Sequence, residues 1–215
     1  MTAIDRDEGL TRIDAAGVRL EGNLIVPNGA KGLVLFAHGS GSSRFSSRNR
    51  SVAEVLRKRG LGTLLIDLLT HDEELVDTRT AHLRFDIELL AERLIGTAEW
   101  LGREKPDLKI GLFGASTGGA AALVTAAQLP DRIHAVVSRG GRPDLAGNAL
   151  PLVKAPTLLI VGGEDTPVIG MNKEAYDRMK CVRRMEIIPG ATHLFEEPGA
   201  LEEVARLAGD WFVKW

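Results

Sequence analysis

The chain has 215 residues, of which 44% are hydrophobic and 26% are charged, and this composition excludes a disordered or fibrous protein. Its 27 basic and 29 acidic residues give a formal net charge of −2, so there is no overall basic excess to hold nucleic acid or an anionic membrane surface. The single cysteine, Cys181, rules out an intramolecular disulfide and favours the reducing cytoplasm. We predict one cytoplasmic domain over residues 1–215, a monomer or homodimer, with no nucleic-acid or membrane partner.

Short apolar runs alternate with longer amphipathic segments along the chain. The first pair of runs, Leu10–Ile13 and Val18–Val26, flanks the turn residues Asp14–Gly17 and predicts a hairpin over Leu10–Pro27. Buried strands are then predicted at Gly32–Ala37, Thr63–Ile66, Lys109–Phe113, Ala135–Ser138, Thr157–Val161 and Met185–Ile188. Helices are predicted at Asn49–Arg59, Ile87–Leu101, Gly118–Leu129, Asn172–Lys180 and Leu201–Val213.

This alternation of strands and helices predicts an α/β fold with a mostly parallel twisted sheet and helices on both faces. The hairpin should add antiparallel strands at one edge of the sheet. In such sheets the working site lies at the carboxyl ends of the strands. The loops expected to face the chemistry therefore begin at His38, Asp67, Gly114, Arg139, Gly162 and Pro189.

The segment Gly114-Ala-Ser-Thr-Gly118 carries the strongest chemical signal. It follows a predicted strand and begins a predicted helix, which is the context of a nucleophile elbow. A sharp turn of this kind needs small neighbours and holds its serine in a strained backbone conformation above the sheet. We therefore predict Ser116 as the nucleophile, with a tight packing turn as the alternative interpretation.

A serine hydroxyl needs a base, and the base needs an acceptor that fixes its tautomer. His193 lies just past the last predicted strand, and Asp165 follows the strand before it. The order Ser116, Asp165, His193 is the order nucleophile, acid, base. Glu164 and Asp144 are the competing candidates for the acid.

The oxyanion formed by attack of a serine requires preorganised N–H donors. Thr117 follows the nucleophile and should supply one of them. The Gly-rich loop His38–Ser42 should supply the second, from Ser40 or, as second choice, Gly41. We interpret His38 as structural, closing this loop through its ring, while a flexible turn is the alternative for the whole segment.

Several further residues are expected on the same face. Arg44 and Arg139, with Arg48 and Arg142 nearby, are candidates for binding a carboxylate or phosphate of the substrate, the alternative being pairs with local acids. Leu194 is a candidate wall of the acyl pocket. The acidic segment around 71–82 lacks metal-ligand spacing, so we expect a solvated loop there and no metal or cofactor. Few residues separate the strands on either side of 138–157, so no large cap fits and an open or shallow site is expected.

The most specific motifs are His38–Arg44 with Arg48–Arg50, Gly114–Gly119, Ser138–Gly147 and Gly190–Gly199. In these motifs the chain, from about Gly17 to its C-terminus, resembles the small lidless dienelactone-hydrolase-like α/β-hydrolases. It is similar to a bacterial subgroup of hydrolases, some of which are fused to a phosphoribosyltransferase domain. The resemblance implies the α/β-hydrolase fold and catalytic roles for Ser116, Asp165 and His193. Named dienelactone hydrolases carry a cysteine where this chain has Ser116, so the resemblance favours a general ester, thioester or lactone as substrate.

The sequence therefore predicts a serine hydrolase of small carboxylic esters, thioesters or lactones that acts through an acyl-enzyme on Ser116. Two alternatives remain open. One is a ligand-binding or sensor protein on the same fold without useful turnover. The other is an acyltransferase or perhydrolase, which passes the acyl group to an acceptor other than water.

Overall fold

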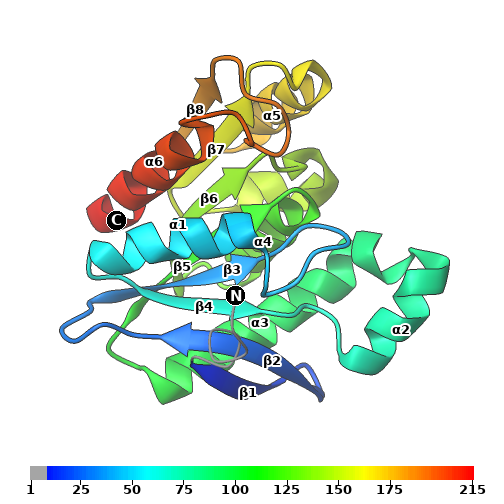
Figure 1. Ribbon diagram of the computed structural model, residues 1–215, viewed down its shortest axis with the longest axis vertical. Helices are drawn as coiled ribbons and strands as arrows, with labels where there is room; N and C mark the ends of the chain where they lie inside the picture. Colours follow the sequence, from blue (N-terminus) through cyan, green and yellow to red (C-terminus); the bar gives the residue numbers. More distant parts are fainter. Residues whose placement is uncertain (1–8) are drawn as a thin grey trace.

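The computed structural model describes residues 9–215 and has an eight-stranded sheet at its centre (Figure 1). The strand order is β1-β2-β4-β3-β5-β6-β7-β8. Strand β2 pairs antiparallel with β1 and with β4, and every other pair is parallel. The predicted hairpin at the edge of a mostly parallel sheet is therefore confirmed. The strands are β1 (Leu10–Ala15), β2 (Val18–Ile25), β3 (Gly32–Ala37), β4 (Gly62–Ile66), β5 (Lys109–Ala115), β6 (Ile133–Arg139), β7 (Thr157–Gly162) and β8 (Arg183–Ile188).

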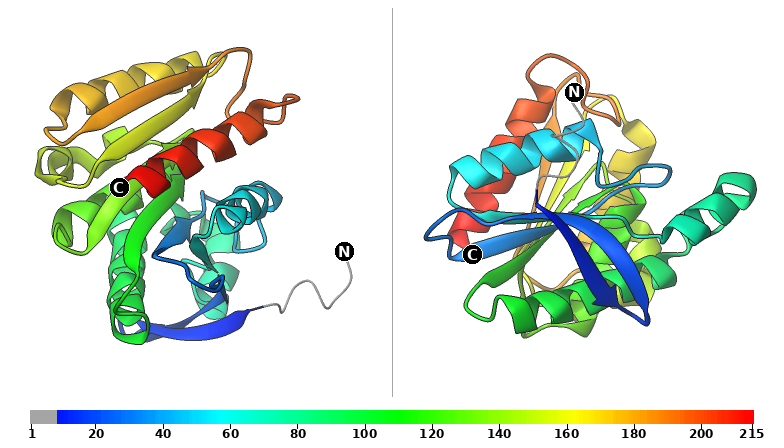
Figure 2. Two further views of the ribbon diagram at one scale, coloured as in Figure 1. Left: turned by 90° about the vertical axis from the view of Figure 1, so that its left-hand side faces the viewer. Right: turned by 60° about the horizontal axis from the view of Figure 1, so that its bottom comes forward.

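Helices cover both faces of the sheet, as the two views of Figure 2 show. Helices α1 and α6 pack together on one face, and α3, α4 and α5 cover the other. Two short 3-10 segments, η2 and η3, complete the described chain. The bounds are α1 (Ser47–Lys58), α2 (His71–Thr80), η2 (Leu83–Phe85), α3 (Ile87–Glu104), α4 (Thr117–Gln128), η3 (Pro143–Leu152), α5 (Thr166–Arg178) and α6 (Ala200–Lys214).

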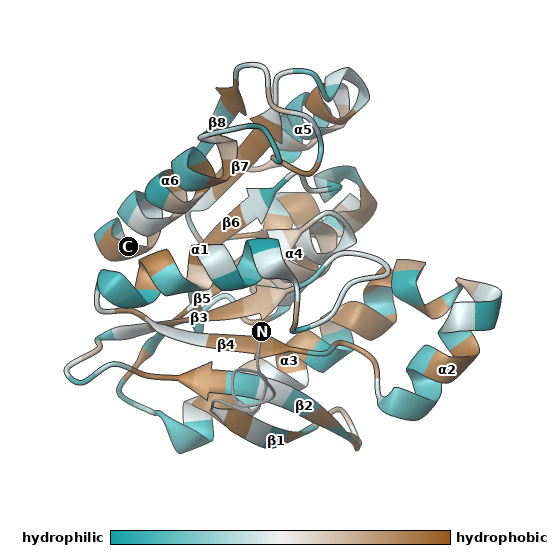
Figure 3. Ribbon diagram, viewed as in Figure 1, coloured by the Kyte–Doolittle hydropathy of each residue, from teal (hydrophilic) through white to brown (hydrophobic). Residues whose placement is uncertain are grey.

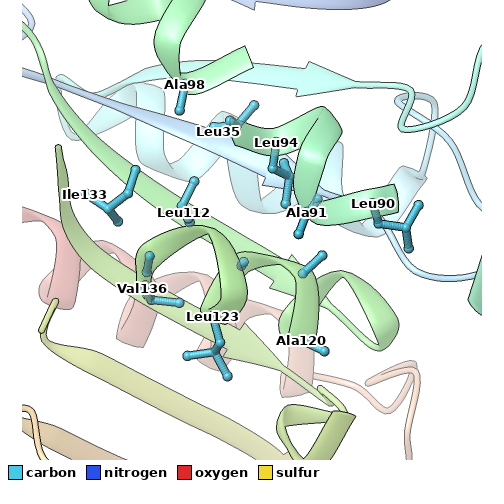
Figure 4. Packing of buried hydrophobic residues seen from close by; sticks show 14 of the residues in the cluster. Leu35, Leu90, Ala91, Leu94, Ala98, Leu112, Ala120, Leu123, Ile133 and Val136 are labelled. Atoms are coloured by element: carbon cyan, nitrogen blue, oxygen red, sulfur yellow. The ribbon is translucent and has the colours of Figure 1, made fainter. Parts of the chain in front are cut away.

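The alternation of side chains along β3 explains how one strand serves two cores. All six residues of β3 are buried, because helices cover both of its faces. Val34 and Phe36 belong to the core beneath α1 and α6, where the Phe36 and Phe113 rings lie 4.9 Å apart. Leu35 faces the opposite way and packs with Leu112 and residues of α3 and α4 (Figure 4). Figure 3 shows apolar residues along the central strands and polar residues on the helices around them.

The acidic segment after β4 differs from the sequence prediction. It forms helix α2, whereas a solvated loop was expected. Thr70 accepts a hydrogen bond from the Glu73 amide (3.2 Å), and the Glu73 side chain accepts one from the Thr70 amide (2.8 Å), which is a capping box. Asp77 is buried and accepts a hydrogen bond from Arg84 Nε at 2.6 Å, so it is not solvated. Prediction missed the helix because it has no apolar face: its Leu75 and Val76 are exposed.

Helix α5 also begins six residues earlier than predicted. It starts at Thr166 and has Pro167 in its first turn, where a proline costs no hydrogen bond. None of the helices within residues 9–215 is long and apolar enough to span a membrane.

Candidate active site

The turn between β5 and α4 holds Ser116 in a backbone conformation that is rare for a residue with a side chain. Its φ is 52° and its ψ is −122°. The Ser116 amide donates to the Arg139 carbonyl (3.3 Å), and its own carbonyl accepts from the amides of Gly119 (3.0 Å) and Arg142 (3.1 Å). These bonds hold the turn in place against a strain that costs about 1–3 kcal/mol. The Ser116 side chain makes no capping hydrogen bond to α4.

The two glycines that flank this turn allow a very close approach of α4 to the sheet. A Cβ atom at Gly114 would lie 2.5 Å from the Gly119 Cα. A Cβ atom at Gly118 would overlap the Ala37 carbonyl oxygen and lie 2.6 Å from that of His38. Side chains at either position would push the helix off β5 and β3. The close packing of α4 against the sheet therefore explains why the turn needs glycine at both positions.

His193 and Asp165 come from the loops after β8 and β7, and their side chains meet. His193 Nδ1 lies 2.7 Å from Asp165 Oδ2, while the Asp165 side chain is nearly buried and makes no capping bond to α5. A Cβ atom at Gly140 would lie 3.6 Å from His193 Cε1. Because Gly140 follows Arg139, whose carbonyl binds the Ser116 amide, the His193 loop lies beside the turn that carries Ser116.

The other acids considered from the sequence have different surroundings. Asp144 accepts hydrogen bonds from Arg142 Nε (2.9 Å) and Nη2 (2.7 Å). Glu164 is held through its backbone, whose amide donates to the Ala191 carbonyl at 2.9 Å. Of the three candidates, Asp165 is the one that contacts His193.

The Gly-rich loop after β3 lies against Ser116. A Cβ atom at Gly39 would be 3.0 Å from the Ser116 Cβ, so the following residue, Ser40, is close to the same centre. His38 fixes this loop: its Nδ1 is 2.9 Å from the Gly39 carbonyl, and its Nε2 accepts from the Leu68 amide at 3.1 Å. Burial lowers the pKa of His38, so its ring is neutral and keeps one tautomer at neutral pH.

A cavity of about 180 Å³ lies beside the loop, and Ser40, Gly41 and Thr117 all line it. Its far wall comes from α2 and η2, through Asp77 and Arg84 among others. The expectation of an open site rested on the short segment between β6 and β7. The structure shows that a different segment, inserted after β4, borders the cavity.

The four arginines singled out in the sequence do not share one environment. Arg44 is largely buried and paired with the carboxylates of Asp67 and Glu21. Arg142 is paired with Asp144. Arg48 pairs through Nη1 with Glu196 at 3.0 Å. Arg139 is buried and packs over the Phe195 ring, with 5.7 Å between its guanidinium carbon and the ring centre.

Leu194, the candidate wall of the acyl pocket, is 40% exposed. No three His, Cys, Asp or Glu side chains in the described part of the chain come together as a metal site would require.

The sheet order, the strained turn after β5 and the covering helices define an α/β-hydrolase fold, which solved structures share. An esterase of Pyrococcus furiosus, 22% identical, superimposes with a TM-score of 0.77 over 100% of this chain and 94% of that one. A dienelactone hydrolase of Anabaena variabilis is 62% identical, with a TM-score of 0.94 over 96% of both chains. The dienelactone hydrolase family model matches residues 20–211, and the chain belongs to this family of hydrolases.

Two curated proteins of Mycobacterium tuberculosis that are named as candidate phosphoribosyl transferases are each 55% identical over 211 residues. The match covers 97% of this chain and 46% of each relative. This chain therefore spans about half the length of the curated relatives that it matches.

Proposed function

We propose that this hydrolase cleaves small carboxylic esters, thioesters or lactones with Ser116 as nucleophile, His193 as base and Asp165 as the acid that orients the base. The observation that carries the proposal is the contact of 2.7 Å between His193 Nδ1 and Asp165 Oδ2, beside a serine held at positive φ at the start of a helix. A carboxylate at Nδ1 keeps the proton on that nitrogen and leaves Nε2 free to accept the serine proton.

The reaction follows from these roles. His193 takes the proton of Ser116 as its oxygen attacks the acyl carbonyl, and the tetrahedral intermediate collapses as His193 protonates the leaving alcohol or thiol. The acyl group then stays on Ser116. Water, deprotonated by His193, attacks this acyl-enzyme and releases the acid. Asp165 stabilises the imidazolium in both halves of the cycle.

The negative charge that develops on the carbonyl oxygen needs donors fixed in advance. In the proposal, these are the backbone N–H of Thr117, the first residue of α4, and that of Ser40, with Gly41 as the alternative. Support comes from the close approach of Gly39 to the Ser116 Cβ and from the ring of His38, which links the Gly39 carbonyl to the Leu68 amide. The start of α4 adds a favourable dipole for the same charge.

The size of the cavity supports small substrates. This cavity of about 180 Å³ is lined by the proposed oxyanion donors Ser40 and Thr117, so in the proposal it receives the part of a small substrate next to the carbonyl. The phosphoribosyl transferase named in the curated relatives belongs to longer proteins and is not part of this proposal.

The test is steady-state hydrolysis of p-nitrophenyl acetate, p-nitrophenyl butyrate and an acetyl thioester. Ser116→Ala should lower kcat by about 10⁴-fold or more, because the variant lacks the oxygen that attacks the acyl carbonyl. Ser51→Ala is the matched control, because Ser51 is an exposed serine of α1. Hydrolysis by Ser116→Ala at the wild-type rate would refute the assignment.

A further inference from the structure

Strand β8 forms one edge of the sheet, and its outer side has no partner strand. It pairs with β7 on one side, and no strand of residues 9–215 pairs with it on the other (Figure 1). Besides β7, its main neighbour is helix α5. A free strand edge of this kind offers a row of backbone N–H and C=O groups to another chain.

The hydrogen bonds to β7 show which backbone groups lie on the outer side of β8. The Thr157 amide donates to the Val182 carbonyl (2.9 Å), and the Gly163 amide donates to the Ile188 carbonyl (2.8 Å). Successive residues of a strand point their backbone groups in opposite directions, so the even-numbered residues from 182 to 188 face β7. The outward-facing residues are the odd-numbered ones, Arg183, Met185 and Ile187.

The side chains of β8 are divided between the two faces of the sheet. Ile188 belongs to the core beneath α1 and α6, so Glu186 and Arg184 lie on that face. Met185 packs against the opposite core, and Ile187 on the same face is 43% exposed. Arg184 and Glu186 form an ion pair within the chain, in which the Arg184 side chain is 62% exposed. The free edge therefore carries one base and one acid on the same face, on either side of Met185.

These charges select one register for a second copy of β8 that runs antiparallel to the first. Two identical strands related by a twofold axis place one residue opposite its own copy. With the axis at any of the three charged residues of β8, like charges would lie directly opposite each other, which is unfavourable. An axis at Ile187 leaves both Arg184 and Glu186 without an opposite charge. With the axis at Met185, Arg184 of each copy faces Glu186 of the other.

The axis at Met185 also matches the backbone groups of the two edges. Met185 then faces its own copy, and Arg183 faces Ile187, so each outward-facing residue is opposite another outward-facing residue. Residues paired in this way exchange both of their backbone hydrogen bonds. On the same face, the two Met185 side chains meet, and the exposed Ile187 side chains gain cover from the aliphatic stems of Arg183.

We propose that this hydrolase forms a homodimer in which the β8 strands of two chains pair antiparallel about Met185 and join the two sheets into one. A second copy of the chain is the partner that fits, because the strand is complementary to itself in charge and in backbone pattern in this register. The carboxyl ends of the two sheets then face in opposite directions, so the two candidate active sites do not obstruct each other. The inference goes beyond the proposed function and does not depend on which residue is the nucleophile.

Charge reversal tests the register, with the dissociation constant (Kd) of the dimer measured by sedimentation equilibrium. Arg184→Glu places acid opposite acid, and Glu186→Arg places base opposite base, so each should raise Kd by about tenfold to a hundredfold. The double variant Arg184→Glu/Glu186→Arg restores the opposite charges and should return Kd close to the wild-type value. Arg12→Glu, on the other edge strand β1, is the matched control and should leave Kd unchanged.

Mixing the two single variants separates pairing between chains from the ion pair within one chain. A mixed dimer of Arg184→Glu with Glu186→Arg has opposite charges at both contacts, whereas each variant alone has like charges there. The equimolar mixture should therefore dimerise about tenfold or more tightly than either variant by itself. A loss of stability within the monomer would give no such recovery on mixing.

A cysteine at the proposed axis tests which residues meet. In the background Cys181→Ser, Met185→Cys should form a disulfide between chains when copper phenanthroline is the oxidant. Facing residues of a hydrogen-bonded antiparallel pair have Cα atoms about 5.5 Å apart, which a disulfide can span. Ile187→Cys is the control on the same face, because its Cα would lie about 13 Å from its own copy.

A wild-type protein that stays monomeric up to about 1 mM would overturn the inference. A dimer whose Kd is unchanged by both charge reversals would overturn it as well, because its interface would lie elsewhere. The same conclusion would follow if mixing brought no gain in affinity. A disulfide that forms as fast in Ile187→Cys as in Met185→Cys would exclude the axis at Met185.

Discussion

Replacing Ser116 with glycine should stabilise the fold relative to replacing it with alanine. Both variants lack the hydroxyl, so they differ only in what the backbone at φ 52° and ψ −122° costs. Strain of this kind costs about 1–3 kcal/mol in a residue with a Cβ atom. Glycine avoids that cost but gains about 0.4–1 kcal/mol of freedom in the unfolded chain. The free energy of unfolding of Ser116→Gly should therefore exceed that of Ser116→Ala by about 1 kcal/mol.

Urea unfolding and thermal melting measure this difference, and about 1 kcal/mol corresponds to about 2–4 °C in a chain of this length. Two alanine-to-glycine substitutions elsewhere serve as controls with opposite expected effects on stability. Ala81 has φ 54° at the end of α2, so Ala81→Gly should also stabilise. Ala127 lies within α4, so Ala127→Gly should destabilise by about 1 kcal/mol. If Ser116→Gly were less stable than Ser116→Ala by about 1 kcal/mol, as for an ordinary helical glycine, the turn would carry no strain.

Three further predictions concern the glycines, His38 and Asp165. Gly118→Ala should lower the free energy of unfolding in urea by about 2 kcal/mol or more, because its Cβ would overlap the Ala37 carbonyl. The control is Gly170→Ala, in open space on α5, which should raise the free energy of unfolding by about 1 kcal/mol. Equal effects of the two substitutions would contradict the close approach of α4 to the sheet. The folded pKa of His38 is lowered, so the unfolded chain takes up the proton first as pH falls through about 6.5, and stability present above that pH is lost below it. His38→Asn should therefore show a shallower fall in melting temperature between about pH 7.5 and 5.5 than wild type, and identical slopes would count against a buried neutral ring. Asp165→Asn should lower kcat by up to about 10⁴-fold, while its melting temperature should stay within a few degrees of the wild type. Full activity of this variant would remove Asp165 from the proposed mechanism.

Much of the fold was predictable because the buried strands are continuous apolar runs in the sequence. Gly32–Ala37 is a continuous apolar run, and β3 has those same bounds. Predicted helices with one apolar face, such as Ile87–Leu101, are confirmed within a few residues. Helix α2 lacks an apolar face, so periodicity could not reveal it. Its capping box, Thr70 with Glu73, was the signal that could have done so.

Part of the candidate site was predictable from the sequence, because residues that follow neighbouring parallel strands lie at the same edge of the sheet. That geometry brings His193 to Asp165. Which of the arginines pair with acids could not be predicted from the sequence. Arg44 finds its acids on β2 and after β4, distant in sequence, and only the folded arrangement shows that Arg139 has no such partner within residues 9–215.

The most direct test of the proposed nucleophile is treatment of the wild-type protein and Ser116→Ala with a fluorophosphonate, followed by intact-mass measurement. One adduct is expected on the wild type and none on the variant, since the probe reacts with a serine whose hydroxyl is activated by a base. Peptide mapping should place the adduct on Ser116. An equal adduct on both proteins, or none on either, would contradict an activated Ser116.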